Sequence, residues 1–271
     1  MKQLVVCDFG SFIGLDQHKI SIKKKDEIVS YPLNRLRTLS IAKNGISISS
    51  DLIESLSARG IKTFFLDFRG IAHSAILGQS QHGVVSVRMA QMAFCQNNTL
   101  ALAKKIISAK IKNQRAVLSY LDKYHKSYFL KSAIQELLKN SEKANHSKNI
   151  TTLLGFEGAS ANNYFQALRK SKLLSSSFKK REGRGSQEIN NSMLNLGYSV
   201  LSSYVLNAVI NAGLEPYLGL LHSKRPGKMA LVLDLMEEYR AWVVDRNVVK
   251  LRSQSEGKSS LDKKKKKTLI N

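Results

Sequence analysis

The sequence predicts an α+β protein in which a small β-rich domain precedes a larger, all-helical one. Short apolar or alternating runs, separated by glycines, fill residues 1–70, whereas apolar residues recur every three or four positions further along. Proline, which interrupts helices, occurs only at Pro216 between Pro32 and Pro226. We expect a β-rich domain at residues 1–78, a helical domain at 79–252 and a basic tail at 253–271.

Strands of the first domain are expected where apolar residues cluster or alternate. Asn44-Gly45 is a pair favoured in type I′ turns, so we expect a hairpin between Leu39–Ala42 and Ile46–Ile48. A short helix fits Asp51–Ala58, because Gly60 lies just past its end. The other expected strands are Leu4–Asp8, His18–Ile22 and Ile61–Leu66.

Helical periodicity dominates the second domain, over Val84–Lys112, Ala116–Tyr128 and Ser132–Leu138. The polar segments Lys139–Asn149 and Ser175–Gln187 are expected to be loops. Ile189–Leu214 contains no charged residue and is long enough to span a bilayer, but its five asparagines would be costly in lipid. We therefore expect it to be a buried helix of a soluble domain, with no membrane partner.

The charge balance indicates a polyanionic partner. Lys and Arg total 43 against 20 for Asp and Glu, a net charge of +23. Nucleic acid is the leading partner and an anionic membrane surface the alternative. The apolar run before Asp8 is too short for a signal-peptide core. Cys7 and Cys95 lack zinc or disulfide spacing, so we expect buried thiols and a cytoplasmic protein.

The segment Met229–Val243 carries the chemistry that the sequence points to. It predicts a helix that is apolar on nearly all sides, and Asp234, Glu237 and Glu238 share one polar arc of roughly 100°. A buried helix with three carboxylates on one arc presents them either to solvent or to a cleft. The segment alone leaves both alternatives open.

His222 and Glu157 favour the second alternative. His222 lies shortly before the carboxylate segment, although a lone histidine is more often structural than a metal ligand. Glu157 stands in the mostly apolar run Leu153–Gly158, where a buried carboxylate needs a partner such as a metal ion. Carboxylates with one imidazole suit Mg²⁺ or Mn²⁺, and such a site can polarise a phosphodiester.

At these residues the sequence resembles the CRISPR-associated integrase/endonuclease family, the catalytic subunit of the complex that acquires CRISPR spacers. The resemblance covers roughly residues 85–250. Ala241 departs from it, because the family usually has proline after the helix arginine. The four matching motifs are Lys110-Ile-Lys-Asn113-Gln114, Glu157-Gly158 with Ala161 and Tyr164, Gly197-Tyr198 through Gly213-Leu-Glu-Pro216 to Gly219-Leu-Leu-His222, and Leu233-Asp234-Leu-Met-Glu237-Glu-Tyr-Arg240.

The resemblance implies a β-sandwich-like N-terminal domain used for dimerisation and a helical catalytic domain. It implies Mg²⁺ or Mn²⁺ bound by Glu157, His222 and Glu237, with Asp234 beside them as a fourth catalytic residue. The implied reaction inserts new spacer DNA into CRISPR arrays, by attack of a DNA 3′-hydroxyl on a phosphodiester. The implied partners are double-stranded and branched DNA, a second copy of the chain and a small ferredoxin-like companion subunit, in a prokaryotic cytoplasm.

DNA contacts are expected from basic and aromatic residues around this site. Tyr164 lies two helical turns from Glu157, and we expect it to position DNA by stacking or by a phosphate hydrogen bond rather than to attack it. The other expected contacts are Lys179, Lys180, Arg181, Arg184, Arg240 and the run Lys263–Lys267.

Two further interpretations stay open at this stage. A transposon-encoded integrase related to the same family would carry the same site. A non-catalytic nucleic-acid-binding protein would have lost an acidic ligand or the histidine, and all of them are present.

Overall fold

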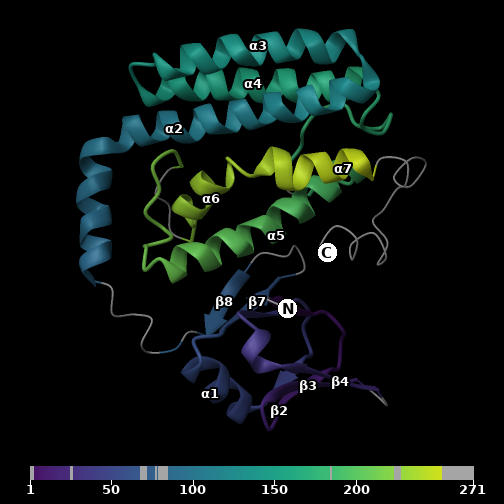
Figure 1. The fold of residues 1–271 in the computed structure, drawn as a ribbon, viewed down its shortest axis with the longest axis vertical. Helices are drawn as coiled ribbons and strands as arrows, with labels where there is room; N and C mark the ends of the chain where they lie inside the picture. Colours follow the sequence, from purple (N-terminus) through teal and green to yellow (C-terminus); the bar gives the residue numbers. More distant parts are fainter. Residues whose placement is uncertain are drawn as a thin grey trace. The chain divides into compact units, whose positions relative to one another are not determined.

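The protein is described by a computed structural model, which covers residues 3–24, 27–67, 72–76, 78, 85–183, 185–222 and 227–251. The chain forms two compact units, residues 1–89 with 210–214, and residues 90–209 with 215–271. The strands lie in the first unit and most helices in the second (Figure 1), so the predicted α+β fold class is confirmed.

The first unit contains two four-stranded sheets. One has the order β1-β5-β7-β8, in which only the β7–β8 pair is antiparallel, and the other has the order β4-β3-β2-β6, in which only β2–β6 is parallel. The strands are β1 Gln3–Val6, β2 Phe12–Asp16, β3 Lys19–Lys24, β4 Glu27–Pro32, β5 Thr38–Ile41, β6 Ser47–Ile48, β7 Lys62–Leu66 and β8 Ala72–Ile76.

Both sheets contribute to one hydrophobic core, together with helix α1 (Ser50–Ala58). Leu4 and Leu39 come from the first sheet, Ile13 and Ile20 from the second, and Leu52 from α1, and all five are buried. Two sheets that share a core in this way form a sandwich-like domain, as the family resemblance implies.

The hairpin expected at Asn44-Gly45 is wrong. β5 and β6 belong to different sheets, so the chain crosses between the layers instead of turning back on itself. Gly45 has a φ of 76°, a left-handed conformation that glycine adopts without strain. The sequence identifies the turn at Gly45. It does not show that the strand after the turn joins the other sheet, because this depends on which strand each apolar face packs against.

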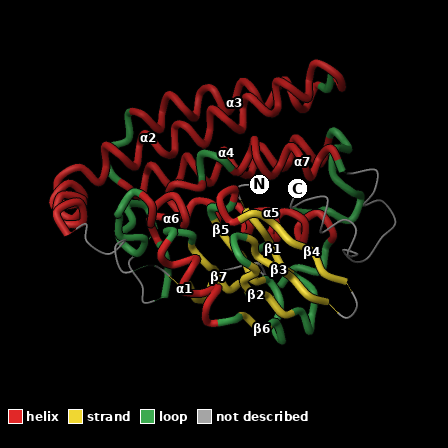
Figure 2. The backbone as a smooth tube through the Cα atoms, turned by 60° about the horizontal axis from the view of Figure 1, so that its bottom comes forward, coloured by secondary structure: helices red, strands yellow, loops and turns green. Residues whose placement is uncertain are grey.

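The second unit is built from long helices. The helices are α2 Val85–His125, α3 Tyr128–Asn145, α4 Ile150–Lys170, α5 Ile189–Asn211, α6 Ala230–Met236 and α7 Arg246–Lys250, with a short π-helix, η3, at Arg240–Asp245. α3 and α4 lie side by side, next to α2 (Figures 1 and 2).

Two predicted helix ends differ from the structure. The helical pattern expected over Val84–Lys112 and Ala116–Tyr128 is one helix, α2, which ends at His125, and within it Gln114 is buried and Asn113 donates to the carbonyl of Glu238 at 2.7 Å. The loop expected from Lys139 is helical up to Asn145, since the polar Ser141 is buried against Ser108. Inward-facing polar side chains hide the periodicity that would have revealed both helices.

Two of the five asparagines of α5 lie inside the second unit. Asn190 and Asn191 are fully buried and accept hydrogen bonds from the backbone of Ser175 and Glu182. Over the described part of the chain, α5 is the one helix long and apolar enough to cross a membrane by length and composition, and 44% of that window is buried.

The carboxylate segment is not the single helix that its periodicity predicts. α6 ends at Met236, and after a turn the chain forms the π-helix η3. A π-helix changes the direction in which successive side chains point, and such segments are frequent at functional sites. Cys95 is buried as expected, whereas Cys7 is exposed.

Candidate active site

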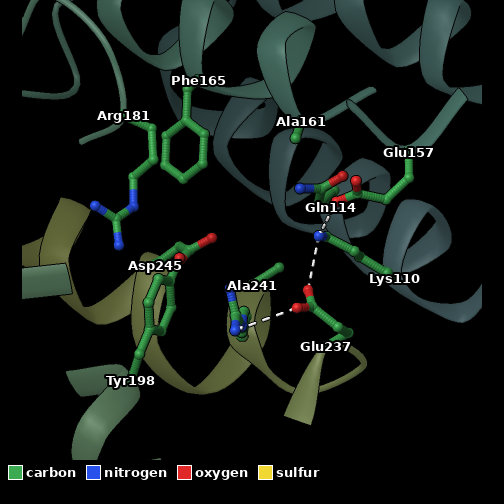
Figure 3. A pocket seen from close by; sticks show the side chains of 11 residues that line it. Lys110, Gln114, Glu157, Ala161, Phe165, Arg181, Tyr198, Glu237, Ala241 and Asp245 are labelled. Carbon is green, nitrogen blue, oxygen red and sulfur yellow. Dashed lines mark hydrogen bonds and ion pairs between the residues drawn. The ribbon is translucent and has the colours of Figure 1, made fainter. Parts of the chain in front are cut away.

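A cavity of about 210 Å³ in the second unit brings together residues from five segments of the chain (Figure 3). α2 contributes Lys110 and Gln114, and α4 contributes Glu157 together with two apolar residues. The remaining wall comes from the loop before α5, from α5 and from the segment that follows α6. The lining residues are Lys110, Gln114, Glu157, Ala161, Phe165, Arg181, Tyr198, Glu237, Arg240, Ala241 and Asp245.

Glu157 and Glu237 meet at the ammonium group of Lys110. Nζ of Lys110 forms ion pairs with Oε1 of Glu157 and with Oε2 of Glu237, the latter at 2.7 Å. Arg240 reaches the other oxygen of Glu237 at 3.2 Å. The contact of Lys110 with Oε2 of Glu237 lacks hydrogen-bond geometry, and that oxygen is buried. The two carboxylates therefore share one cation, and one of their oxygens is left without a hydrogen bond.

Asp234 and His222 form a second, separate cluster. Oδ2 of Asp234 accepts from the backbone N–H of Leu220 at 2.5 Å and of Leu221 at 3.0 Å. Oδ1 accepts from the backbone N–H of His222 at 3.1 Å and lies 2.5 Å from Nδ1 of its ring. Gly219 permits this approach, since a Cβ there would meet Ala230 at 2.4 Å. Asp234 thus fixes the ring through Nδ1 and leaves Nε2 as the nitrogen available to a ligand.

The predicted metal ligands are only partly gathered. Within the described part of the chain, no three His, Cys, Asp or Glu side chains are close enough together to hold a metal ion. Glu157 and Glu237 face the same cation, whereas His222 is oriented by Asp234 outside the cavity lining. Asp234 and Glu237, which the sequence predicts on one polar arc with Glu238, are both buried and have different partners.

The predicted DNA contact of Tyr164 is wrong. Its side chain is fully buried and does not line the cavity, so the ring has no surface on which a base or phosphate can bind. It packs edge-on against Phe165, with the ring centroids 5.1 Å apart. Burial, followed by the charge of Asp245, raises the pKa of Tyr164 well above its usual value. The i+7 offset from Glu157 placed it on the same helix, but on the side that faces the core.

The basic residues divide into exposed and fixed ones. Lys179 and Lys180 are exposed, whereas Arg181 donates to Asn191 at 3.1 Å and to Asn195 at 2.6 Å and lines the cavity. Arg240 also lines the cavity, with its guanidinium 4.7 Å from the centre of the Tyr198 ring. Arg184 and the run Lys263–Lys267 lie outside the described residues.

Three titratable residues of the cavity, Lys110, Tyr198 and Asp245, were not predicted as site residues. The hydroxyl of Tyr198 donates to Oδ1 of Asp245 at 2.6 Å. Burial raises the pKa of Asp245 to about 6, although this hydrogen bond and the charge of Arg240 act in the opposite direction. Lys110 and Tyr198 belong to the motifs quoted above, and that membership is the signal by which the sequence could have identified them. Asp245 lies outside these motifs and reaches the cavity from the π-helix η3.

The fold and this cavity define a class: an α+β protein with a paired-carboxylate site and basic walls in its helical unit. The chain belongs to the family described as CRISPR associated protein Cas1, whose model matches residues 4–271. The family predicted from the motifs is therefore confirmed.

The relatives support the same family. The chain is 58% identical over 270 residues to "CRISPR-associated endonuclease Cas1 1" of Francisella tularensis subsp. novicida, covering 100% of this chain and 85% of the relative. At this identity over the whole chain, the predicted enzyme class, a DNA endonuclease of the CRISPR system, is confirmed.

Solved structures share the fold at low sequence identity. A CAS1 protein from Thermotoga maritima has a TM-score of 0.79 at 20% identity, over 97% of this chain and 82% of that one. A casposase bound to integration product has a TM-score of 0.74 at 24% identity, over 97% and 75%. A Cas6-RT-Cas1–Cas2 complex has a TM-score of 0.76 at 24% identity, over 93% of this chain and 28% of the longer one.

Proposed function

We propose that this chain is the metal-dependent DNA endonuclease and integrase that inserts new spacer DNA into CRISPR arrays by 3′-hydroxyl transesterification. The observation that carries the proposal is the convergence of Glu157 and Glu237 on one cation position, inside a cavity with basic walls. A cation between these carboxylates removes the repulsion that they would exert on a phosphodiester.

The two carboxylates of the cavity fit a divalent cation, whereas His222 lies outside the cavity lining and would have to move within reach of the ion. An ammonium group already lies between the two carboxylates, and the buried Oε2 of Glu237 lacks a hydrogen bond. Glu157, Glu237 and Nε2 of His222 would hold Mg²⁺ or Mn²⁺, and the imidazole favours manganese. When bound, the ion polarises a phosphodiester and stabilises the charge that develops on it. Asp234 would not bind the ion itself but would hold the imidazole of His222 in one tautomer and orientation.

Other residues of the cavity would position the DNA. Arg240 and Arg181 place two guanidinium groups at the wall, where they can bind phosphate oxygens. Lys110 would leave its place between the carboxylates and remain on the wall as a third cation.

A protein–DNA covalent intermediate is not part of the proposal. Tyr164 is buried, and the Tyr198 hydroxyl donates to Asp245. Burial and the adjacent Asp245 carboxylate raise the pKa of Tyr198 well above its usual value, so the phenol stays protonated and is a poor nucleophile. A DNA hydroxyl or water is therefore the attacking group.

The proposed partners follow from the family. They are double-stranded and branched DNA, a second copy of this chain joined through the β-rich domain at residues 1–78, and a small ferredoxin-like companion subunit. A structure similar to this chain is a Cas6-RT-Cas1–Cas2 complex, which supports the companion. The proposed location is the cytoplasm of a prokaryote.

Strand transfer on labelled branched DNA tests the proposal. We expect joined product with Mn²⁺ or Mg²⁺ and none with a chelator, while DNA binding is largely kept. Glu157→Gln, Glu237→Gln and His222→Ala should each lower the rate by about a thousandfold or more, equivalent to roughly 4 kcal/mol. Glu238→Gln is the matched control, because this neighbouring carboxylate does not line the cavity. A His222→Ala protein with the unmodified rate contradicts the site.

The same assay separates the two other functions. The casposase likeness concerns the fold, and a transposon-type integrase would prefer transposon-end donors over CRISPR-repeat targets. A non-catalytic DNA-binding protein would show no transfer with either substrate.

A further inference from the structure

The side chain of Gln91 forms a two-point contact with the backbone of Glu215. Its Nε2 donates to the Glu215 carbonyl at 3.1 Å, and its Oε1 accepts from the Glu215 N–H at 2.8 Å. An amide side chain that satisfies both backbone groups of one residue imitates the pairing of neighbouring β-strands. Gln91 lies in the second turn of α2, 124 positions away along the chain, so the contact joins two segments that no local structure brings together.

The contact fixes the first residue of a segment that ends at His222. Residues 215–222, which we call the histidine segment, form neither a helix nor a strand. Contacts from other elements therefore have to hold most of its backbone in place. The carbonyl of Pro216, the second residue of the segment, accepts from the N–H of Leu231 in α6 at 3.0 Å.

The middle and the end of the histidine segment are held by different means. Leu220 is buried in an apolar cluster with Cys95 and Ile106 of α2. The N–H groups of Leu220 and His222 both donate to the carboxylate of Asp234. The segment is thus attached at its start by an amide of α2, in its middle by apolar packing and at its end by a carboxylate.

The amide of Gln91 sets the register of the segment along α2. Apolar packing has no preferred direction, so it resists separation of the segment from α2 more than sliding along it. Two hydrogen bonds from one side chain are directional and fix both the distance and the register. α2 also carries Lys110, whose ammonium contacts Glu157 and Glu237. One helix therefore holds both the start of the histidine segment and the cation between the two carboxylates.

This register matters because His222 lies outside the cavity lining and has to move to reach an ion between the carboxylates. A segment that is fixed at its start has fewer conformations in which the imidazole lies elsewhere. Less conformational entropy is then lost when the imidazole binds the ion. Contacts that orient a metal ligand without touching the metal change metal affinity by about 10- to 100-fold.

We propose that Gln91 is a positioning residue for His222, which it provides by holding the start of the histidine segment on α2. Gln91 does not line the cavity and lies outside the four family motifs. The inference rests on the proposed metal-dependent function and adds to it a residue remote from the reacting groups.

Hydrogen–deuterium exchange in a chelator tests the positioning without any metal. Gln91→Met removes both hydrogen bonds and keeps the length of the side chain. We expect the amides of Leu220, Leu221 and His222 to exchange about tenfold faster, while those of α3 and α4 keep their rates. Gln96→Met is the matched control, because Gln96 is an exposed glutamine of the same helix, and it should change none of these rates.

Direct titration with Mn²⁺, followed by the spin resonance of the free ion, tests the consequence for the ligand without measuring activity. Gln91→Met should weaken Mn²⁺ binding about tenfold, and Gln96→Met should leave it unchanged. Gln91→Glu keeps the acceptor for the Glu215 N–H and loses the donor, so it should show both effects at smaller size. This variant replaces Gln91→Met if the latter does not fold.

The outcomes separate the inference from the proposed function. Unchanged exchange at the three amides overturns the inference, as does a uniform rise over the whole second unit, which would make Gln91 a general stabilising residue. Faster local exchange with unchanged Mn²⁺ affinity also overturns it. An unmodified chain that neither binds Mn²⁺ nor transfers strands contradicts the proposed function, and the exchange of the three amides then decides by itself whether Gln91 positions His222.

Discussion

Two carboxylate clusters of the second unit differ in how completely their oxygens are satisfied. Asp234 accepts from three backbone N–H groups and faces the ring of His222, so each of its oxygens has two partners. Glu157 and Glu237 instead share one ammonium group, and one buried oxygen of Glu237 has no hydrogen bond. Saturated carboxylates hold a structure in place, whereas undersatisfied ones are available to a ligand.

This comparison predicts the largest change in stability for Asp234→Asn. An amide would point its NH₂ group at backbone N–H donors on one side of the residue, whichever way it is turned. We expect a loss of about 3 kcal/mol in the free energy of unfolding, measured by chemical denaturation. Glu237→Gln should cost only about 1 kcal/mol, because Lys110 keeps Glu157. Equal losses in the two variants would contradict the distinction between the clusters.

Asp245 is a third buried carboxylate, and it extends the comparison to the pH dependence of stability. Its pKa is about 6 in the folded protein and 3.8 in the unfolded chain. Between these pH values the folded protein therefore keeps a proton on Asp245 that the unfolded chain has released. Its contribution to stability is therefore greatest at low pH and falls as pH rises from about 4 to 6.

Asp245→Asn should abolish this pH dependence. The difference in unfolding free energy between the variant and the unmodified protein should change by about 2 to 3 kcal/mol between pH 4 and pH 7, in favour of the variant at pH 7. Denaturation curves of both proteins across that range provide the measurement. A difference that does not vary with pH would show that Asp245 titrates normally.

Lys110→Met probes the undersatisfied cluster directly. Without the ammonium the two carboxylates lose their shared cation, so the variant in chelator should be less stable by about 1 to 2 kcal/mol. It should gain more stability from Mn²⁺ than the unmodified protein does, since no ammonium has to be displaced. Thermal unfolding with and without Mn²⁺ measures both effects. Lys112→Met, an exposed lysine of the same helix, is the control that should change neither.

The smallest expected effect concerns the basic loop. Replacing the exposed Lys179 and Lys180 by Gln should reduce the slope of log affinity against log salt by at most about 2, roughly one per phosphate contact. Arg181 is tied to Asn191 and Asn195, so its replacement should disturb the cavity more than the slope. A slope unchanged in the double variant would remove these lysines from the DNA-binding surface.

The sequence by itself determined the order of the two kinds of structure and the family. Apolar residues alternate along a strand and recur every three or four positions along a helix, because these spacings place them on one buried face. Glycines mark the turns between the strands. The motifs also single out Glu157, His222, Asp234 and Glu237, since an acid or a histidine in an apolar run is rare and conspicuous.

Only the tertiary structure decided which partner each of these residues has. Lys110 lies in one motif and Glu157 in another, and nothing local specifies that their side chains meet. Tyr164 is buried because of what packs against its helix, and Asp245 reaches the cavity because a π-helix changes the direction of the side chains. Periodicity reports that a face is covered but not what covers it, because the covering residues lie far away along the chain.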